Sequence, residues 1–314
     1  MTESYTFTQK SQINVIFNQK KANDTATLPH YREERLKHQP LELIESKLSK
    51  LIGLEEVKKV VKEIYAWIYV NQRRGERNLK VPSQSLHMLF KGNPGTGKTT
   101  VARLLGELLC DMEILSKGHL IEAERADLVG EYIGQTAQKT RELVKKAKGG
   151  ILFIDEAYSL ARGGEKDFGK EAIDTLVKQM EDLREDFILI LAGYSDEMED
   201  FLSQNPGLPS RFPIIISFPN YSGSELLLIA HQMLDEQEYK LTSEAEKKLK
   251  RYLDIKSIEE NESFSNGRFV RNLIEKMIRQ QAVRLLREGR FDRESLLTVR
   301  ACDLIIEENK EVGH

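Results

Sequence analysis

Short apolar runs alternate with longer amphipathic segments through the middle of the chain. The runs predict five strands, near 86–90, 120–122, 151–154, 187–192 and 214–216. Four consecutive apolar residues, as at 151–154, are typical of a parallel strand buried on both faces. Between the runs, apolar residues recur at helical spacing, as at Ile173, Leu176 and Met180. This alternation predicts a five-stranded, mostly parallel α/β domain.

Helical patterns flank this domain on both sides. Two amphipathic segments, at 41–51 and 55–70, precede the first strand. After the turn residues at 219–223, almost every pattern is helical, at about 223–238, 243–253 (capped by Thr242 or Ser243) and 268–288, with a short closing element at 296–306. We therefore expect an extension at 1–40, an α/β domain at 41–220 and a small all-helical domain at 221–314. The extension is either a loose terminus or an interaction arm.

A glycine-rich stretch after the first strand predicts a phosphate-binding loop. Residues 92–99 match the pattern G-x-x-x-x-G-K-[ST], between a predicted strand and a predicted helix. Glycines let the backbone N–H groups point inward at a phosphate. Lys98 supplies a charge for the β- and γ-phosphates, and Thr99 supplies a hydroxyl for Mg²⁺. The predicted nucleotide contacts are Gly92, Asn93, Pro94, Gly95, Thr96, Gly97, Lys98, Thr99 and Thr100.

Two carboxylates follow the most apolar strand. Asp155 and Glu156 come directly after 151–154, at the strand end where ligands bind in open α/β sheets. In a nucleotide site the aspartate orients a water on Mg²⁺, and the glutamate polarises the attacking water. The sequence thus predicts ATP and Mg²⁺ as cofactors, with Thr99 and Asp155 at the metal.

Composition limits the partners and the location that we expect for the protein. The 314 residues are 40% hydrophobic and 31% charged, with a formal net charge of −3, which gives no general attraction to nucleic acid or to an anionic membrane. The two cysteines argue against a disulfide framework. No basic and apolar leader and no apolar run of about 20 residues is visible. We expect a cytoplasmic protein.

The motifs together resemble the AAA+ ATPases, and within them the subgroup named after CbbX, the red-type Rubisco activase. The similar stretches are G-N-P-G-T-G-K-T, Y-I-G, I-D-E-A-Y-S-L, E-A-I-D-T-L-V-K and N-P-G-L-x-S-R-F, within residues 41–307. Residues 118–140, 157–180 and 266–272 are most similar to the sporulation members of that subgroup from endospore-forming bacilli. The resemblance implies a P-loop NTPase fold with a helical lid.

The resemblance also implies catalytic roles for arginines. Arg211 matches the arginine finger, which reaches the γ-phosphate in a neighbouring subunit; a structural ion pair is the alternative. Arg268 matches the second sensor, which the lid contributes to its own site, and Arg271 is the rival for that role.

Two further matches concern the nucleotide. Tyr194 or Ser195 stands where the first sensor ends its strand, although many AAA+ proteins have Asn or Thr there and a packed tyrosine is the alternative. Ile52 and Gly53 match the segment that contacts adenine.

Tyr132, Ile133 and Gly134 match the pore loop with which ring-forming remodellers grip an extended peptide. The alternative is an aromatic side chain packed beneath a loop. The charged segment 162–167 is either a second pore loop or a solvated loop.

The resulting hypothesis is a Mg²⁺-dependent ATPase that assembles into a ring, a hexamer as is usual for AAA+ proteins, and remodels a protein client in spore formation. Its partners are other copies of itself and a client protein. The alternatives are an activase of Rubisco or another metabolic enzyme, and a scaffold that binds ATP with little turnover. A clamp loader is disfavoured because the chain has no basic-aromatic groove signature.

Overall fold

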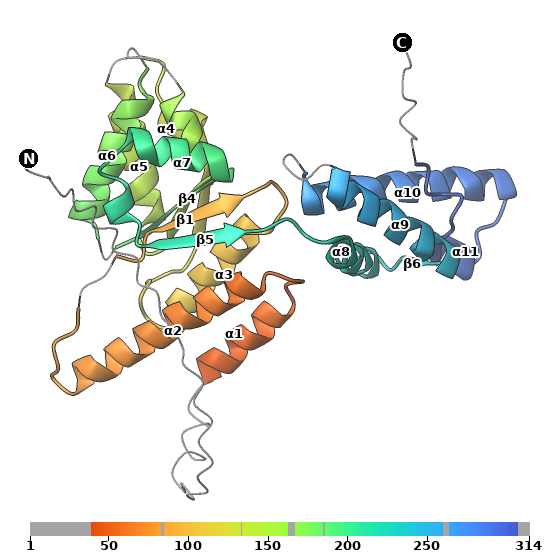
Figure 1. The fold of residues 1–314 in the computed structure, drawn as a ribbon, viewed down its shortest axis with the longest axis horizontal. Coiled ribbons are helices and arrows are strands. Elements are labelled where there is room, and N and C mark those ends of the chain that lie inside the picture. Colours follow the sequence, from red (N-terminus) through yellow and green to blue (C-terminus); the bar gives the residue numbers. More distant parts are fainter. Residues whose placement is uncertain are drawn as a thin grey trace, which may run out of the picture. The chain divides into compact units, whose positions relative to one another are not determined.

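The computed structural model describes residues 39–82, 85–132, 134–162, 167–184, 186–259 and 264–306 (Figure 1). Three predictions fall on residues outside these ranges: 1–38 of the interaction arm, Ile133 of the pore loop, and 163–166 of the charged loop.

A five-stranded sheet forms the centre of the first domain, and all its strands are parallel. The order is β2–β3–β4–β1–β5. The strands are β1 (Met88–Gly92), β2 (Leu120–Ala123), β3 (Ile151–Ile154), β4 (Ile188–Gly193) and β5 (Ile214–Phe218). Because the strands run the same way, the loops that follow β1, β3 and β4 meet at one edge of the sheet.

Helices lie on both sides of the sheet (Figure 1). Alternate strand residues belong to two different hydrophobic clusters, one with each layer of helices. Met88 and Phe90 of β1 belong to the cluster on the side of α1, α2 and α3, and Leu89 belongs to the cluster that includes α5, α6 and α7. The helices are α1 (Gln39–Ser49), α2 (Glu55–Glu76), α3 (Lys98–Asp111), α4 (Arg125–Leu128), α5 (Gln135–Ala147), α6 (Gly169–Asp182) and α7 (Ser195–Gln204). The predicted fold class is thereby confirmed.

Two short helices lie where the pattern had not indicated one. The single turn α4 lies directly after β2, where no helix was predicted, and its Leu128 is fully buried. The helix α7 follows β4 directly and buries Met198 and Phe201. Each helix buries so few apolar side chains that its amphipathic signal is weak.

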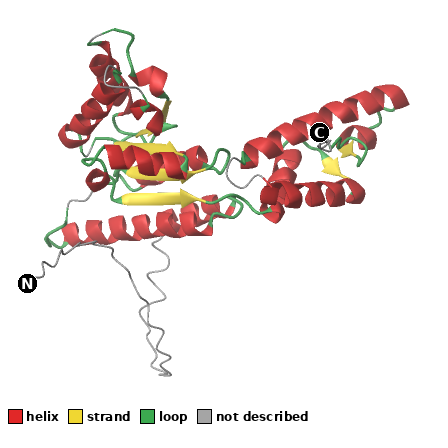
Figure 2. Ribbon diagram, turned by 45° about the horizontal axis from the view of Figure 1, so that its top comes forward, coloured by secondary structure: helices red, strands yellow, loops and turns green. Residues whose placement is uncertain are grey.

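The C-terminal domain is helical, with one small exception to the all-helical prediction. Its helices are α8 (Gly223–Asp235), α9 (Ser243–Glu259), α10 (Asn266–Glu288) and α11 (Arg293–Leu297), and the two-residue strands β6 (Lys240–Leu241) and β7 (Thr298–Val299) pair in parallel (Figure 2). The helix α9 extends past residue 253, its expected end. Of the two expected caps, Thr242 is the one used: its hydroxyl accepts from the Ala245 N–H at 3.2 Å.

The longest helices are amphipathic. The helices α2 and α10 have 22 and 23 residues, and both carry charged side chains along their length. None of the helices in the described ranges is long and apolar enough to cross a membrane.

Candidate nucleotide-binding site

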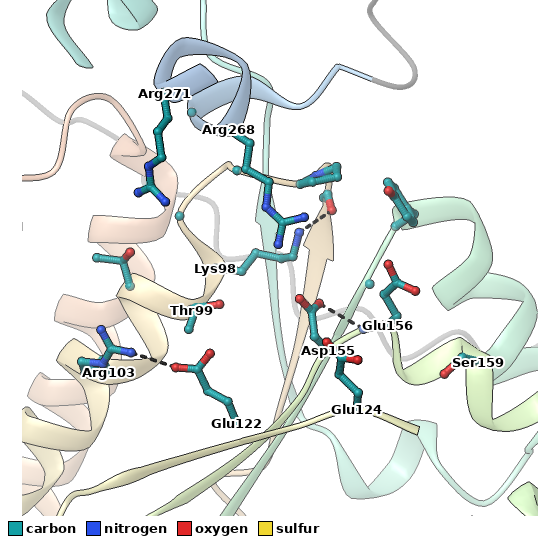
Figure 3. Close-up of a pocket in the computed structure, with 18 of the residues that line it drawn as sticks. Lys98, Thr99, Arg103, Glu122, Glu124, Asp155, Glu156, Ser159, Arg268 and Arg271 are labelled. Carbon is teal, nitrogen blue, oxygen red and sulfur yellow. Dashed lines mark hydrogen bonds and ion pairs between the residues drawn. The ribbon is translucent and has the colours of Figure 1, made fainter. Parts of the chain in front are cut away.

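A large cavity of about 1110 Å³ opens at the edge of the sheet where β1, β3 and β4 end (Figure 3). The phosphate loop, the end of β3 and the start of α10 all contribute to its wall. The predicted site residues that line it are Ile52, Gly92, Pro94, Gly95, Gly97, Lys98, Thr99, Thr100, Asp155, Glu156, Tyr194 and Arg268, together with the rival Arg271. Residues from separate stretches of the chain thus converge on one cavity.

The Lys98 ammonium is held by the loop itself. Its Nζ donates to the backbone oxygens of Gly92 at 2.7 Å and Asn93 at 2.8 Å. Burial lowers the pKa of Lys98 below its usual range, and Asp155 is the strongest opposing charge. The loop therefore presents a buried cation beside the cavity, where a phosphate would replace the two carbonyl partners.

The backbone of the phosphate loop and the N-terminus of α3 both face the cavity. Gly97 has φ +94° and is the N-cap of α3, so the free N–H groups of that helix face the cavity lined by Lys98 and Thr99. A helix N-terminus with a positive partial charge is a suitable site for a phosphate.

Asp155 and Glu156 stand side by side at the end of β3. The Glu156 N–H donates to Asp155 Oδ1 at 3.0 Å. Glu156 has φ +46°, a left-handed conformation that is strained for a non-glycine residue, and the chain turns there into a 3-10 helix. The Thr99 hydroxyl and the Asp155 carboxylate line the same cavity and are the hard oxygen donors that suit Mg²⁺.

The start of α10 brings two arginines to the cavity. Arg268 and Arg271 both line it, and both side chains are largely exposed. In Figure 3, Arg268 points toward Lys98, whereas Arg271 points away from it on the other side of the loop. The Arg268 charge also lowers the pKa of Lys98, after the larger effect of burial.

Apolar side chains also line the cavity. Ile52 lines it together with Ile229 and Met233 of α8, which sequence reasoning did not single out. Gly53 does not line the cavity; it has φ +61°, and a Cβ atom there would overlap the Glu225 carboxylate. Glycine at this position thus lets the segment before α2 approach the first turn of α8.

Tyr194 lines the cavity and also packs on a neighbour. Its ring centroid lies 6.0 Å from that of the buried Tyr158, and Arg162 stacks on the Tyr158 ring at 4.5 Å. Its place in the cavity wall fits the sensor interpretation, and its contact with Tyr158 fits the packed-tyrosine interpretation. Ser195 begins α7 and does not line the cavity.

Asn93 and Thr96 of the loop, and Arg211, do not line the cavity. The Asn93 side chain donates to Asn220 Oδ1 at 2.9 Å, and the buried Thr96 hydroxyl donates to the Asn93 backbone oxygen at 2.7 Å. Arg211 ends a 3-10 helix, forms an ion pair with Glu181 and donates to the Gly207 backbone oxygen. In a single chain, therefore, Arg211 has the structural ion pair that was the alternative to its finger role.

The two described residues of the predicted pore loop, Tyr132 and Gly134, are exposed. Tyr132 has 67% of its surface exposed, so it is not packed beneath the loop. Gly134 has φ +85° and caps α5, and the space that a Cβ atom would occupy there is open, with no neighbouring atom within 4 Å.

Tyr221 supports the phosphate loop and was missed by sequence reasoning. Its hydroxyl donates to the Thr96 backbone oxygen at 3.1 Å, and burial raises the pKa of Tyr221 to about 12. The wall also contains the ion pair between Arg103 and Glu122, at 2.8 Å. Tyr221 lies in the segment between β5 and α8, and Arg103 and Glu122 are single charges on a helix and a strand, so the sequence around these residues gives no signal that points to a nucleotide.

Comparison with known proteins identifies the family. A family model described as "ATPase family associated with various cellular activities (AAA)" matches residues 88–220, and the AAA lid domain matches residues 222–314. The chain belongs to the AAA ATPase family. Members of this family bind ATP, which agrees with the cavity and its loop.

Three curated relatives of this AAA protein cover most of its length. It is 61% identical to Stage V sporulation protein K of Bacillus subtilis (strain 168), over 98% of both chains. It is 43% identical to Protein CbbX of Cereibacter sphaeroides, over 90% of this chain and 92% of that one. It is 44% identical to the chloroplastic ribulose bisphosphate carboxylase/oxygenase activase of Cyanidioschyzon merolae, over 81% and 87%. The predicted resemblance to the CbbX subgroup and its sporulation members is confirmed.

A solved structure has a similar fold. A mutant of Thermogota maritima RuvB matches with a TM-score of 0.52 and 20% identity, over 80% of this chain and 69% of that chain. At this identity the likeness concerns the fold alone.

Proposed function

We propose that this AAA protein hydrolyses ATP to ADP and phosphate with Mg²⁺, and that it does so as a ring that remodels a protein client. The observation that carries the proposal is the convergence of Lys98, Asp155, Glu156 and Arg268 on one cavity. A buried cation, a metal-binding carboxylate, a second carboxylate and an arginine are the groups that phosphoryl transfer to water requires.

Each group has one role in this proposal. Lys98 and Arg268 hold the β- and γ-phosphates, and Thr99 and Asp155 hold the metal. When bound, Mg²⁺ neutralises charge on the phosphate oxygens. Glu156 accepts a hydrogen bond from the attacking water and turns it toward the γ-phosphate. Tyr194 contacts the same region from the end of β4.

Arg211 acts in the site of a neighbouring subunit in this proposal. Its position outside the cavity of its own chain supports an action in trans. Ring assembly then completes the site, because charge on the transferring phosphoryl group needs a further cation. The ion pair with Glu181 is half-exposed and therefore weak enough to exchange for a phosphate.

The exposed Tyr132 is the proposed client contact. An aromatic ring grips an extended peptide without reading its sequence, and the client is a protein. A role in spore formation is proposed from the 61% identity to the sporulation relative. The competing function is the activation of Rubisco or another metabolic enzyme, which the 43% identity to Protein CbbX favours.

The test is the steady-state ATPase rate of the wild type and of Glu156→Gln. We expect the substitution to lower kcat by at least about 100-fold, because it removes the group that activates water, while nucleotide affinity stays unchanged. Glu63→Gln, an exposed position on α2, is the matched control and is expected to keep the wild-type rate.

Equal and negligible rates in the wild type and Glu156→Gln would favour the ATP-binding scaffold and end the hydrolytic proposal. The same variant holds ATP and its client, so its captured partners, from sporulating or Rubisco-containing cells, separate the two biological roles.

A further inference from the structure

Three asparagines from three segments of the chain bond to one another beside the phosphate loop. Asn93 lies in the loop, Asn220 lies between β5 and α8, and Asn266 is the first residue of α10. Asn220 Oδ1 accepts from Asn93 Nδ2 and from Asn266 Nδ2, both at 2.9 Å. We call these three residues the asparagine clasp.

Only one orientation of the Asn266 side-chain amide satisfies its hydrogen bonds. The side chain is fully buried; its Oδ1 accepts from the Tyr221 N–H at 2.9 Å, and its Nδ2 also donates to the Phe264 backbone oxygen at 2.8 Å. A flipped amide would set N–H against N–H and oxygen against oxygen. Asn266 therefore connects the start of α10 to the segment between β5 and α8 and, through Asn220, to the phosphate loop.

Backbone contacts make the same junction tight. The Gly267 N–H donates to the Gly95 backbone oxygen at 3.0 Å. A Cβ atom at Gly95 would overlap the Ser265 carbonyl and would lie 2.7 Å from the Arg268 nitrogen. The first turn of α10 thus rests directly on the phosphate loop, and it carries Arg268 two residues after Asn266.

One end of the clasp lies at the phosphate position. The Lys98 ammonium donates to the Gly92 and Asn93 backbone oxygens. A phosphate forms stronger, charge-assisted bonds to that ammonium than a carbonyl does, so its arrival removes the ammonium from the Asn93 carbonyl and leaves that carbonyl with the Thr96 hydroxyl as donor. Asn93 carries both this carbonyl and the amide that holds Asn220.

We propose that the asparagine clasp couples phosphate occupancy to the orientation of the lid, with Asn220 and Asn266 as positioning residues for Arg268. The proposal rests on the proposed function, in which a nucleotide occupies this cavity. Asn220 is the relay, because its single oxygen accepts from both the loop and the lid.

The test compares Asn220→Ala, which removes the shared acceptor, with Asn220→Asp, which keeps it. Asn272→Ala, at an exposed position on α10, is the matched control. In a chain with Cys110 and Cys302 replaced by serine, spin labels at the exposed positions Lys145 of α5 and Lys250 of α9 report the distance between sheet domain and lid. Double electron–electron resonance is recorded without nucleotide, with ADP and with a non-hydrolysable ATP analogue, and affinity is measured with fluorescent ADP.

We expect the parent, Asn220→Asp and Asn272→Ala to change their label distance when nucleotide binds. Asn220→Ala is expected to show one unchanged distribution in every state, although its ADP affinity falls only roughly two- to tenfold, as for a lost hydrogen bond. A parent-like shift in Asn220→Ala, or no shift in a parent that has bound nucleotide, would overturn the coupling. Hydrolysis by the parent is followed in parallel: failure to bind or hydrolyse ATP counts against the proposed function, and a parent-like shift in Asn220→Ala counts against the clasp alone.

Discussion

At the scale of single residues, three buried polar side chains have hydrogen-bond partners that depend on the fold. Lys98, Asn266 and His87 are all nearly or fully buried. Lys98 and Asn266 donate to backbone oxygens, and His87 Nδ1 accepts from the Leu189 N–H at 3.0 Å. Such groups stabilise one arrangement of the chain, since each loses its partner in any other.

His87 should make stability depend on pH. Burial lowers the pKa of His87 from 6.5 to about 4, with Arg184 as a smaller contribution in the same direction. Between these values the unfolded chain binds a proton that the folded chain does not, so stability falls as the pH falls through 6.5 toward 4. From pH 7 to pH 5 the loss from this group is about 2 kcal/mol.

Urea unfolding at both pH values checks this prediction, with His87→Asn as the comparison. Asparagine keeps an acceptor for Leu189 and does not titrate, so its loss over the same range should be smaller by about 2 kcal/mol. Identical losses in both proteins would show that His87 has no part in the pH response.

At the scale of elements, the last helices are held together by polar groups as well as by apolar packing. Gln281 of α10 donates to three backbone oxygens around α11 and β7, those of Ser295, Leu296 and Thr298. Arg284, one turn later, forms two bonds with the buried Asp303, at 2.8 and 3.0 Å. Together with the buried side chains of Val299 and Leu304, these bonds connect a short closing segment to the long helix α10.

Removal of Asp303 should therefore destabilise the lid. Asp303→Ala removes both hydrogen bonds from the carboxylate to the half-buried Arg284 guanidinium, whose remaining ion pair is the longer one with Glu288, at 3.5 Å; we expect the free energy of unfolding to fall by about 1.5 to 3 kcal/mol. The double variant Arg284→Met, Asp303→Leu replaces the pair by apolar groups and should lose much less. Urea unfolding followed by circular dichroism measures both, and an equal loss in the two proteins would contradict the role of the ion pair.

At the scale of the whole molecule, the cavity of one chain brings together Lys98, the Asp155–Glu156 pair and Arg268, whereas Arg211 does not line it and pairs with Glu181 instead. If Arg211 acts between subunits, then subunits that lack different groups should complement each other. A subunit with Glu156→Gln still offers Arg211, and a subunit with Arg211→Ala still has its own Glu156.

Mixing these two variants tests the shared site. Each variant alone should be slower than the wild type, by at least about 1000-fold for Arg211→Ala and about 100-fold for Glu156→Gln. In an equal mixture about a quarter of the interfaces join an intact Glu156 to an intact Arg211, so ATPase activity should return. A mixture of Glu156→Gln with Arg268→Ala should regain no ATPase activity, because Glu156 and Arg268 both act in the site of their own chain. No recovery in the first mixture would place Arg211 outside the neighbouring site.

Much of the fold and part of the site followed from local patterns. The order of strands and helices, the phosphate loop and the pair Asp155 and Glu156 are encoded in adjacent residues, where periodicity and turn chemistry act directly. The short helices α4 and α7 and the strands β6 and β7 were missed, because each has too few residues for a periodic signal.

The sequence by itself therefore determined the glycine-rich loop motif and the adjacent carboxylates, Asp155 and Glu156, that line the cavity. The tertiary structure decided which distant groups meet there. Asn93 and Asn220 are 127 residues apart and share a hydrogen bond, and Gly95 needs its small size because α10 lies against it. Such contacts depend on how the sheet and the lid pack, and no local pattern records a partner that is more than a hundred residues away.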